Sequence, residues 1–273
     1  MLNLHSMQRL LFALLLATAV LSAQAASNYE PQVGQEGKDV IWVPTPQALI
    51  DKMLDAAKVT KDDYVIDLGS GDGRTVITAA KRGAHALGIE YNPDMVELSK
   101  ANADKEGVSA RAQFAKADIF ESDFSKATVI TMYLLPQLNL KLRPKILDLK
   151  PGTRIVSHAF TMDDWRADET VSSQDNASYS RTAYLWIVPA KVDGTWKTAQ
   201  GEITFKQTFQ MLSGSVKNGG STMAIETGRL RGDQITFTAG GTEYTGRVSG
   251  GAIEGSMRGA NSGNWSATRT GGK

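Results

Sequence analysis

A cluster of glycine and acidic residues, Asp67-Leu-Gly69-Ser-Gly71-Asp-Gly73, begins at the end of the apolar run Tyr64–Leu68. The run predicts a buried strand and the residues from Arg74 onward predict a helix, so the glycines fall in a strand-to-helix loop. A ligand that crosses the strand ends must approach the backbone closely, and a Cβ there would block it. We therefore expect a ligand site lined by Asp67, Gly69, Ser70, Gly71 and Gly73.

A second carboxylate, Glu90, ends the next apolar run, Ala86–Glu90, and Tyr91 follows it. A carboxylate at this place can accept hydrogen bonds from both hydroxyls of a ribose. The alternative is a solvated carboxylate at a strand end. We assign Glu90 and Tyr91 to the same ligand site as the glycine loop.

Two classes of cofactor are bound by glycine loops of this kind. The dinucleotide pattern G-x-G-x-x-G would place its third glycine at position 74, which is Arg74. The acidic Asp67, two residues before the first glycine, belongs instead to the pattern of class I methyltransferases. The loop therefore predicts S-adenosyl-L-methionine (SAM) as the cofactor.

A third acidic residue, Asp118, follows the expected strand Ala112–Ala117. In class I methyltransferases an acid at this point accepts from the adenine amino group, and the next apolar residue, here Ile119, packs on the ring. An aspartate that caps the following turn or helix is the alternative. Asp118 and Ile119 complete the predicted cofactor site.

Three further residues are candidates for the side of the site that takes the methyl acceptor. Methyl transfer is an in-line displacement that needs a positioned, desolvated and neutral nucleophile. Backbone carbonyls and the Tyr133 hydroxyl, in the turn that ends at Pro136, can hold an amine by its protons, and His158 can take a proton. The alternatives are a packed aromatic residue for Tyr133, a helix start for Pro136 and a buried, hydrogen-bonded histidine for His158.

The elements that must hold these residues alternate between strand and helix. The pattern predicts a helix from Gln47 with Thr45 as its cap, and a helix over Pro93–Glu106 capped by Asn92. Further strands are expected over Ala127–Tyr133 and Gly152–Ala159. Alternation of this kind predicts a parallel sheet. Glu169–Ser173 and Thr182–Val188 have no helix between them and predict a closing antiparallel hairpin. The fold class is α/β, with a Rossmann-like seven-stranded sheet.

The composition and the apolar pattern of the sequence change after Pro189. The region from about Val192 to Arg269 is rich in glycine, threonine and serine, and its apolar residues alternate along the chain. Regular turn signals there predict a small all-β meander, closed as a barrel or folded as a sandwich, which Trp196 and Trp265 are expected to close by packing together.

The N-terminal residues Met1–Ala25 have the three parts of a secretory signal peptide. Arg9 precedes the apolar run Leu10–Leu21, and Ala23-Gln-Ala25 supplies small residues for cleavage. The predicted organisation is a signal peptide over 1–25, a methyltransferase domain over 26–190 and a β domain over 191–273. The protein is expected to be exported, periplasmic or secreted, or to be membrane-anchored where the signal is not cleaved.

Composition excludes several other classes of site. The chain has 273 residues, a formal net charge of +1 and no cysteine, so disulfides, thiolate metal sites and cysteine nucleophiles are absent. No spacing of metal ligands is present. A near-neutral chain lacks the electrostatic signature of nucleic-acid binding, so no nucleic-acid partner is expected. The expected partner is a protein or a small-molecule methyl acceptor.

Several segments run in the order of a known family. They are Val43-Pro-Thr-Pro46, Asp67–Arg74, Gly88–Pro93, Tyr133–Pro136, Leu142–Pro144, and Ser157-His158 with Asp164-Trp165. In these segments the chain, from about Gln32 to Val188, resembles the small SAM-dependent protein-lysine methyltransferases that include the ATP synthase c-subunit lysine methyltransferase. The resemblance implies methylation of a lysine amine, with Tyr133–Pro136 near the acceptor and SAM bound by Asp67, Gly69, Gly71, Glu90 and Asp118.

Two other functions are consistent with the residues. The signal peptide favours an exported protein that binds SAM or a related nucleoside without turnover. The β region, which lies outside the resemblance, favours an interaction or adhesion module with an envelope or protein partner.

Overall fold

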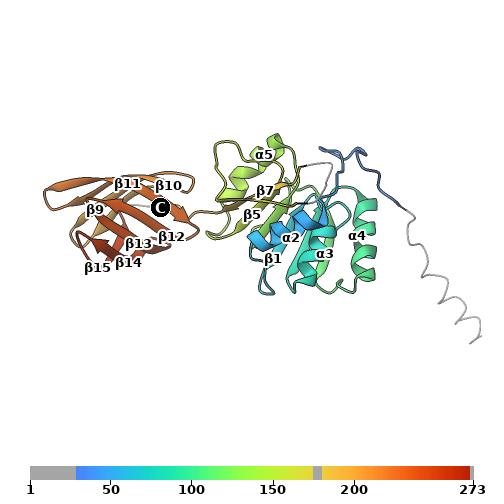
Figure 1. Ribbon diagram of the computed structural model, residues 1–273, viewed down its shortest axis with the longest axis horizontal. Helices are drawn as coiled ribbons and strands as arrows, with labels where there is room; N and C mark the ends of the chain where they lie inside the picture. Colours follow the sequence, from blue (N-terminus) through green and yellow to red (C-terminus); the bar gives the residue numbers. More distant parts are fainter. Residues whose placement is uncertain (1–28, 175–179, 271–273) are drawn as a thin grey trace, which may run out of the picture.

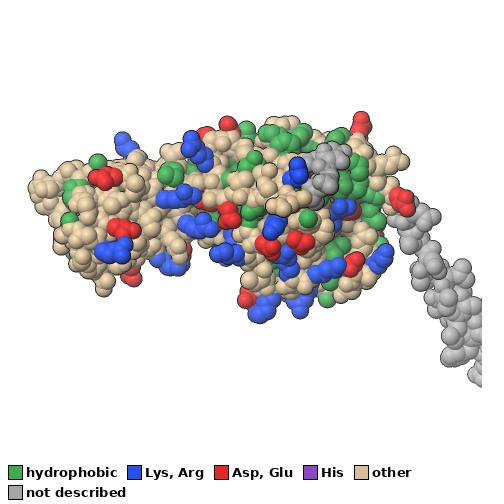
Figure 2. All heavy atoms as spheres, viewed as in Figure 1, with side chains coloured by type: hydrophobic (Ala, Val, Ile, Leu, Met, Phe, Trp, Pro, Cys, Tyr) green, Lys and Arg blue, Asp and Glu red, His purple; other side chains and the backbone are tan. Residues whose placement is uncertain are grey.

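The computed structural model describes residues 29–174 and 180–270, so the predicted signal peptide lies outside the described residues. An α/β domain and an all-β barrel lie next to each other along the long axis of the molecule (Figure 1). On the face drawn in Figure 2, basic and acidic side chains of the described residues are interspersed over the α/β domain. Within the described ranges, no helix is long and apolar enough to cross a membrane.

The α/β domain contains a mixed sheet of seven strands in the order β3-β2-β1-β4-β5-β7-β6. The strands are β1 (Tyr64–Leu68), β2 (His85–Glu90), β3 (Ala112–Lys116), β4 (Val129–Met132), β5 (Arg154–His158), β6 (Glu169–Ser172) and β7 (Thr182–Ile187). The first five strands are parallel, and β7 is antiparallel to both β5 and β6. The predicted α/β fold and its closing hairpin are confirmed.

Four helices follow the expected pattern: α2 (Gln47–Ala56), α3 (Arg74–Lys81), α4 (Pro93–Lys105) and α5 (Pro136–Leu147). Asn92 caps α4 as predicted, since its side chain accepts from the backbone of Asp94 and Met95. The predicted cap of α2 by Thr45 is wrong. The cap position is Pro46 and makes no side-chain hydrogen bond, while the Thr45 hydroxyl lies 3.0 Å from Nδ1 of His158.

The C-terminal region forms a closed antiparallel barrel of eight strands. The strands are β8 (Gly194–Thr198), β9 (Gly201–Thr208), β10 (Met211–Asn218), β11 (Ser221–Arg231), β12 (Gln234–Ala239), β13 (Thr242–Ser249), β14 (Ala252–Gly259) and β15 (Gly263–Arg269). Pairing of β15 with β8 closes the barrel. Trp196 and Trp265 both lie in its hydrophobic core, where the ring of Trp265 contacts those of Phe237 and Tyr244. Of the two expected architectures, the barrel is therefore the one formed.

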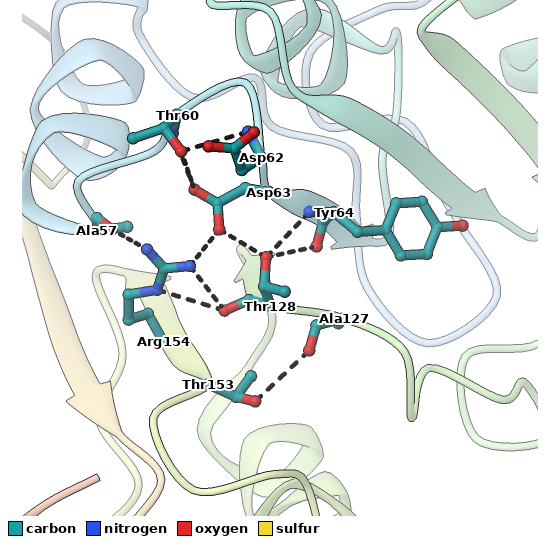
Figure 3. Close-up of polar contacts among 9 residues, drawn as sticks. All are labelled: Ala57, Thr60, Asp62, Asp63, Tyr64, Ala127, Thr128, Thr153 and Arg154. Atoms are coloured by element: carbon teal, nitrogen blue, oxygen red, sulfur yellow. Dashed lines mark hydrogen bonds and ion pairs between the residues drawn. The ribbon is translucent and has the colours of Figure 1, made fainter.

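A polar network joins three elements at the amino ends of the central strands (Figure 3). The Asp63 carboxylate contacts the Arg154 guanidinium and accepts a hydrogen bond of 2.7 Å from the Thr128 hydroxyl. Arg154 also donates to the carbonyl of Ala57, which ends the α2 region, at 3.0 Å. Although burial favours the neutral acid, the hydrogen bonds from Thr128, the Thr60 amide and Arg154 hold the pKa of Asp63 below its usual value. The network stabilises the edge of the sheet opposite to the candidate site.

Candidate functional site

A cavity of about 710 Å³ lies at the carboxyl ends of the parallel strands. Its walls are the segments that follow the strands, Gly69–Asp72 after β1, Glu90–Asn92 after β2, Ala117–Ile119 after β3 and Met132–Leu135 after β4. Ligands of open parallel sheets bind at this edge. The volume falls in the range of cofactor sites.

The glycine loop lies on the floor of this cavity in a conformation that side chains rarely adopt. Gly71 has φ +54°, and a Cβ there would lie 2.6 Å from Nε1 of Trp42. Gly73, which caps α3, has φ +83°, and its Cβ would lie 2.8 Å from the ring of Phe114. Gly73 does not itself line the cavity, so it supports the loop rather than the ligand. The hydroxyl of Ser70 lines the same loop, buried and without a hydrogen-bond partner among the described residues.

Glu90 is held in place by the backbone around it. One carboxylate oxygen accepts from the amide of Gly71 and the other from the amide of Asn92, both at 2.9 Å. Each oxygen keeps a second lone pair for the cavity. The arrangement fits a carboxylate that accepts from two neighbouring hydroxyls.

Asp67 is buried at the end of β1, with 6% of its surface exposed. Burial raises the pKa of this carboxyl group to about 7, and the charges of Glu90 and Asp72 act in the same direction. A hydrogen bond of 2.6 Å from the Thr131 hydroxyl opposes the shift. A positive group in the cavity would therefore lie beside a carboxyl group that is poised to ionise near neutral pH.

Asp118 and Tyr91 lie beside a lysine that sequence reasoning did not identify. The Asp118 carboxylate contacts the Lys38 ammonium, and the same ammonium lies 4.9 Å from the centre of the Tyr91 ring. The hydrogen bond and charge of Lys38 lower the pKa of Asp118. Asp118 also accepts from the Phe120 amide at 2.9 Å, so it caps a turn, and Ile119 lines the cavity next to it.

Residues 35–45 form one wall of the cavity, which we call the N-terminal strap. Its backbone folds back on itself, because the Trp42 amide donates to Gln35 O and the Gly34 amide donates to Trp42 O, both at 2.9 Å. The sequence analysis assigned no site residue to this segment, and no strand forms there. The one sequence signal for a binding segment was Trp42 within the short apolar run Val40–Val43.

Tyr133 and His158 lie against each other, with their ring centres 3.8 Å apart. Tyr133 lines the cavity, whereas His158 is completely buried and does not. Nε2 of His158 lies 2.8 Å from the carbonyl oxygen of Ser180, which only accepts, so Nε2 carries the proton and Nδ1 accepts from Thr45. With both nitrogens engaged, this geometry favours His158 as a support for Tyr133 over the predicted role as proton acceptor.

Pro136 is the third predicted residue of the acceptor side, and the structure does not bring it to the cavity. It is exposed at the first position of α5. Its neighbours Leu135 and Leu138 line the cavity instead, together with Phe160, whose ring is stacked with that of Tyr133 at 6.2 Å. The described residues hold no cluster of three or more potential metal ligands.

The donor set and shape of this cavity fit SAM. Gly69 and Gly71 bring the backbone of the loop to the cavity, Glu90 offers oxygens for a ribose, and the Ser70 hydroxyl, which has no partner among the described residues, lies at the loop. The carboxyl groups of Asp67 and Asp118 also line the cavity. Such a site can hold a nucleoside that carries a positive charge.

Comparisons with known proteins agree with this geometry. Residues 67–169 match the model of the ANTKMT methyltransferase domain. A protein-lysine N-methyltransferase of Saccharolobus islandicus is 45% identical over 152 residues, which are 55% of this chain and 94% of the relative. The ATP synthase c-subunit lysine N-methyltransferase of Xenopus laevis is 30% identical over 55% of this chain and 70% of its own length.

A solved structure is also similar to part of this chain. It is described as an RNA methyltransferase from Salinibacter ruber in complex with S-adenosyl-L-homocysteine. It is 45% identical to this chain, with a TM-score of 0.52, and the match covers 55% of this chain and 96% of that structure. The match therefore covers nearly the whole of that structure and about half of this chain.

Proposed function

We propose that this chain, which belongs to the SAM-dependent protein-lysine N-methyltransferase family, methylates the side-chain amine of a lysine in a protein acceptor. The observation that carries the proposal is the 45% identity to the Saccharolobus islandicus protein-lysine N-methyltransferase over 94% of that relative. The cofactor is SAM, in line with the methyltransferase domain model and with the Salinibacter ruber structure bound to S-adenosyl-L-homocysteine. What we propose beyond methyl transfer from SAM is the acceptor, a lysine side chain of a protein.

The residues around the cavity support such a reaction. When bound, SAM supplies an electrophilic methyl group. Glu90 and the glycine loop would hold the cofactor, while Tyr133, Leu138 and Phe160 form an apolar wall. Burial against such a wall disfavours a charged ammonium and so favours the neutral amine that attacks. The Tyr133 hydroxyl and the carbonyls after β4 would orient that amine.

The test is transfer of a labelled methyl group from SAM to a total protein extract and, separately, to total RNA. RNA is included because the Salinibacter relative is described as an RNA methyltransferase. The proposal predicts label in protein, with methyl-lysine found by mass spectrometry, and at least about a tenfold loss of rate in Tyr133→Phe with unchanged SAM affinity. Label confined to RNA would contradict the assignment of the acceptor.

We also propose that the protein is exported. The support is the sequence of Met1–Ala25, with Arg9 before an apolar run and Ala23 and Ala25 at the cleavage positions. Fusion of these residues to a reporter that is active only outside the cytoplasm tests this directly. Export without detectable transfer, but with SAM bound, would favour the alternative of a SAM-binding protein without turnover.

A further inference from the structure

The turn between β9 and β10 inserts an aromatic side chain into the α/β domain. Phe209 of this turn stacks on Trp165, with ring centres 5.8 Å apart and an interplanar angle of 14°. It packs against the hydrophobic cluster of the sheet, not that of the barrel. Trp165 is completely buried, and the centre of its ring also lies 6.1 Å from that of Trp186.

Polar contacts from the barrel hold the chain on either side of this stack. The Gln210 side chain donates to the carbonyl of Arg166 at 2.7 Å. Arg229, on β11, pairs with Asp168 at 2.6 Å, and the Asp168 side chain has no exposed surface. Because a buried carboxylate needs a partner, the contact of Arg229 with Asp168 ties the barrel to the α/β domain.

The segment that the barrel holds runs from the last residue of β5 to the start of β6, over residues 158–168. At its start Phe160 lines the cavity, and at its end lie Trp165 and Asp168. Two of its residues that are not glycine, Ala159 and Asp163, have φ values of +66° and +57°. Backbone in this region persists only where surrounding contacts impose it.

Helix α5 also holds residues 158–168. The Asn139 side chain donates to the carbonyl of Thr161 at 3.2 Å, and Arg143 donates to the carbonyl of Met162 at 2.9 Å. The Arg143 guanidinium also lies 5.3 Å from the centre of the Phe209 ring. One side chain of the α/β domain therefore contacts both residues 158–168 and the barrel.

We propose that the barrel is a positioning element for the acceptor side of the cavity. Phe209, packed between Trp165 and Arg143, fixes residues 158–168 and thereby the wall that contains Phe160. The conformation of the turn supports this role, since Phe209 has φ +54° and its carbonyl accepts a hydrogen bond of 2.7 Å from the Gln207 side chain. A simple tether needs neither the strained backbone nor the inserted ring. The role at the acceptor rests on the proposed function.

The test is hydrogen exchange of the full chain with Phe209→Ala. Peptides over residues 158–168 should exchange at least about tenfold faster, whereas peptides over 67–74 and the affinity for SAM should be unchanged. The matched control is Met211→Ala, two residues away and 51% exposed, which should leave every peptide as in the wild type. Phe209→Tyr keeps the stacked ring and should restore slow exchange.

Activity gives the second readout. With the protein acceptor identified by methyl labelling, Phe209→Ala should raise the KM for that acceptor or lower kcat by at least about tenfold, with the KM for SAM unchanged. Unchanged exchange over 158–168 in a folded variant, or uniform acceleration across the whole α/β domain, would overturn the proposal. If Phe209→Ala does not fold, Phe209→Leu and Arg229→Met are measured against the same criteria. The exchange readout uses no acceptor, so failure of methyl transfer in the wild type contradicts only the proposed function.

Discussion

At the scale of single residues, the protonation of Asp67 is the feature that responds most to pH. The folded protein raises its pKa from 3.8 to about 7, so between these values the folded state binds more protons than the unfolded state. The free energy of unfolding contributed by this group therefore falls as pH rises from about 4 to about 7.

Asp67→Asn should remove that dependence, because the amide keeps the acceptor for Thr131 and carries no charge. Relative to the wild type, the variant should gain about 3 kcal/mol of stability between pH 4 and pH 7.5. Urea unfolding at both pH values measures the difference, with the exposed Asp62→Asn as control. Parallel pH profiles for wild type and Asp67→Asn would show that the group ionises normally.

The residues that sequence reasoning identified are those whose role depends on local spacing. Glu90 follows from its place after a strand, and Asn92 from its place before a helix. The contact between Thr45 and His158 joins residues 113 positions apart, and nothing near either residue indicates it. Lys38 beside Asp118 was missed for the same reason, since the two are 80 positions apart.

At the scale of elements, the network in Figure 3 predicts where the sheet is most sensitive to mutation. Arg154→Met removes a cation from Asp63, whose side chain is only 8% exposed. An uncompensated, largely buried carboxylate should cost about 3 kcal/mol of unfolding free energy. Denaturant unfolding measures this, and Lys61→Met, which removes a largely exposed pair with Asp62, should change little.

The same network has a defined pH dependence. Because the folded pKa of Asp63 lies below its unfolded value, its stabilisation is present above about pH 4 and is lost as pH falls through the folded pKa. In Arg154→Met the acid-induced loss should be smaller. An equal loss in both proteins would exclude Arg154 as a cause of the lowered pKa.

The N-terminal strap is the element whose removal should affect the cofactor most selectively. Trp42 lies over Gly71, so Trp42→Ala should open one wall of the cavity and accelerate SAM dissociation about tenfold, with little change in melting temperature. Stopped-flow displacement measures the rate. Val33 lies outside the strap and is 53% exposed, and Val33→Ala should dissociate SAM at the wild-type rate. Equal rates in the two variants would exclude the strap as a cofactor wall.

Elements were predicted well where periodicity is strong. The parallel strands and the capped helix α4 follow from apolar runs and from Asn92-Pro93. The predicted strand Ala127–Tyr133 is shorter, Val129–Met132, so Tyr133 lies beyond the strand in the cavity wall. The sequence of the N-terminal strap has no apolar periodicity, because contacts with other segments of the chain hold it rather than regular secondary structure.

At the scale of the whole molecule, the regular glycines and alternating apolar residues after Pro189 were enough to predict an all-β unit. The way this unit docks was not predictable, because Phe209 and Trp165 meet through folding of two separate regions. The family model matches residues 67–169, which lie within the α/β domain.

The central claim, that the cavity at the carboxyl edge of the sheet binds SAM through Glu90, is tested most directly by calorimetry. Residues 26–273 would be titrated with SAM, alongside Glu90→Gln and the exposed control Glu121→Gln. We predict saturable binding by the wild type and the control, weakened by about 2 kcal/mol, or roughly thirtyfold, in Glu90→Gln. Binding of equal strength in all three proteins, or no binding by a folded wild type, would contradict this claim.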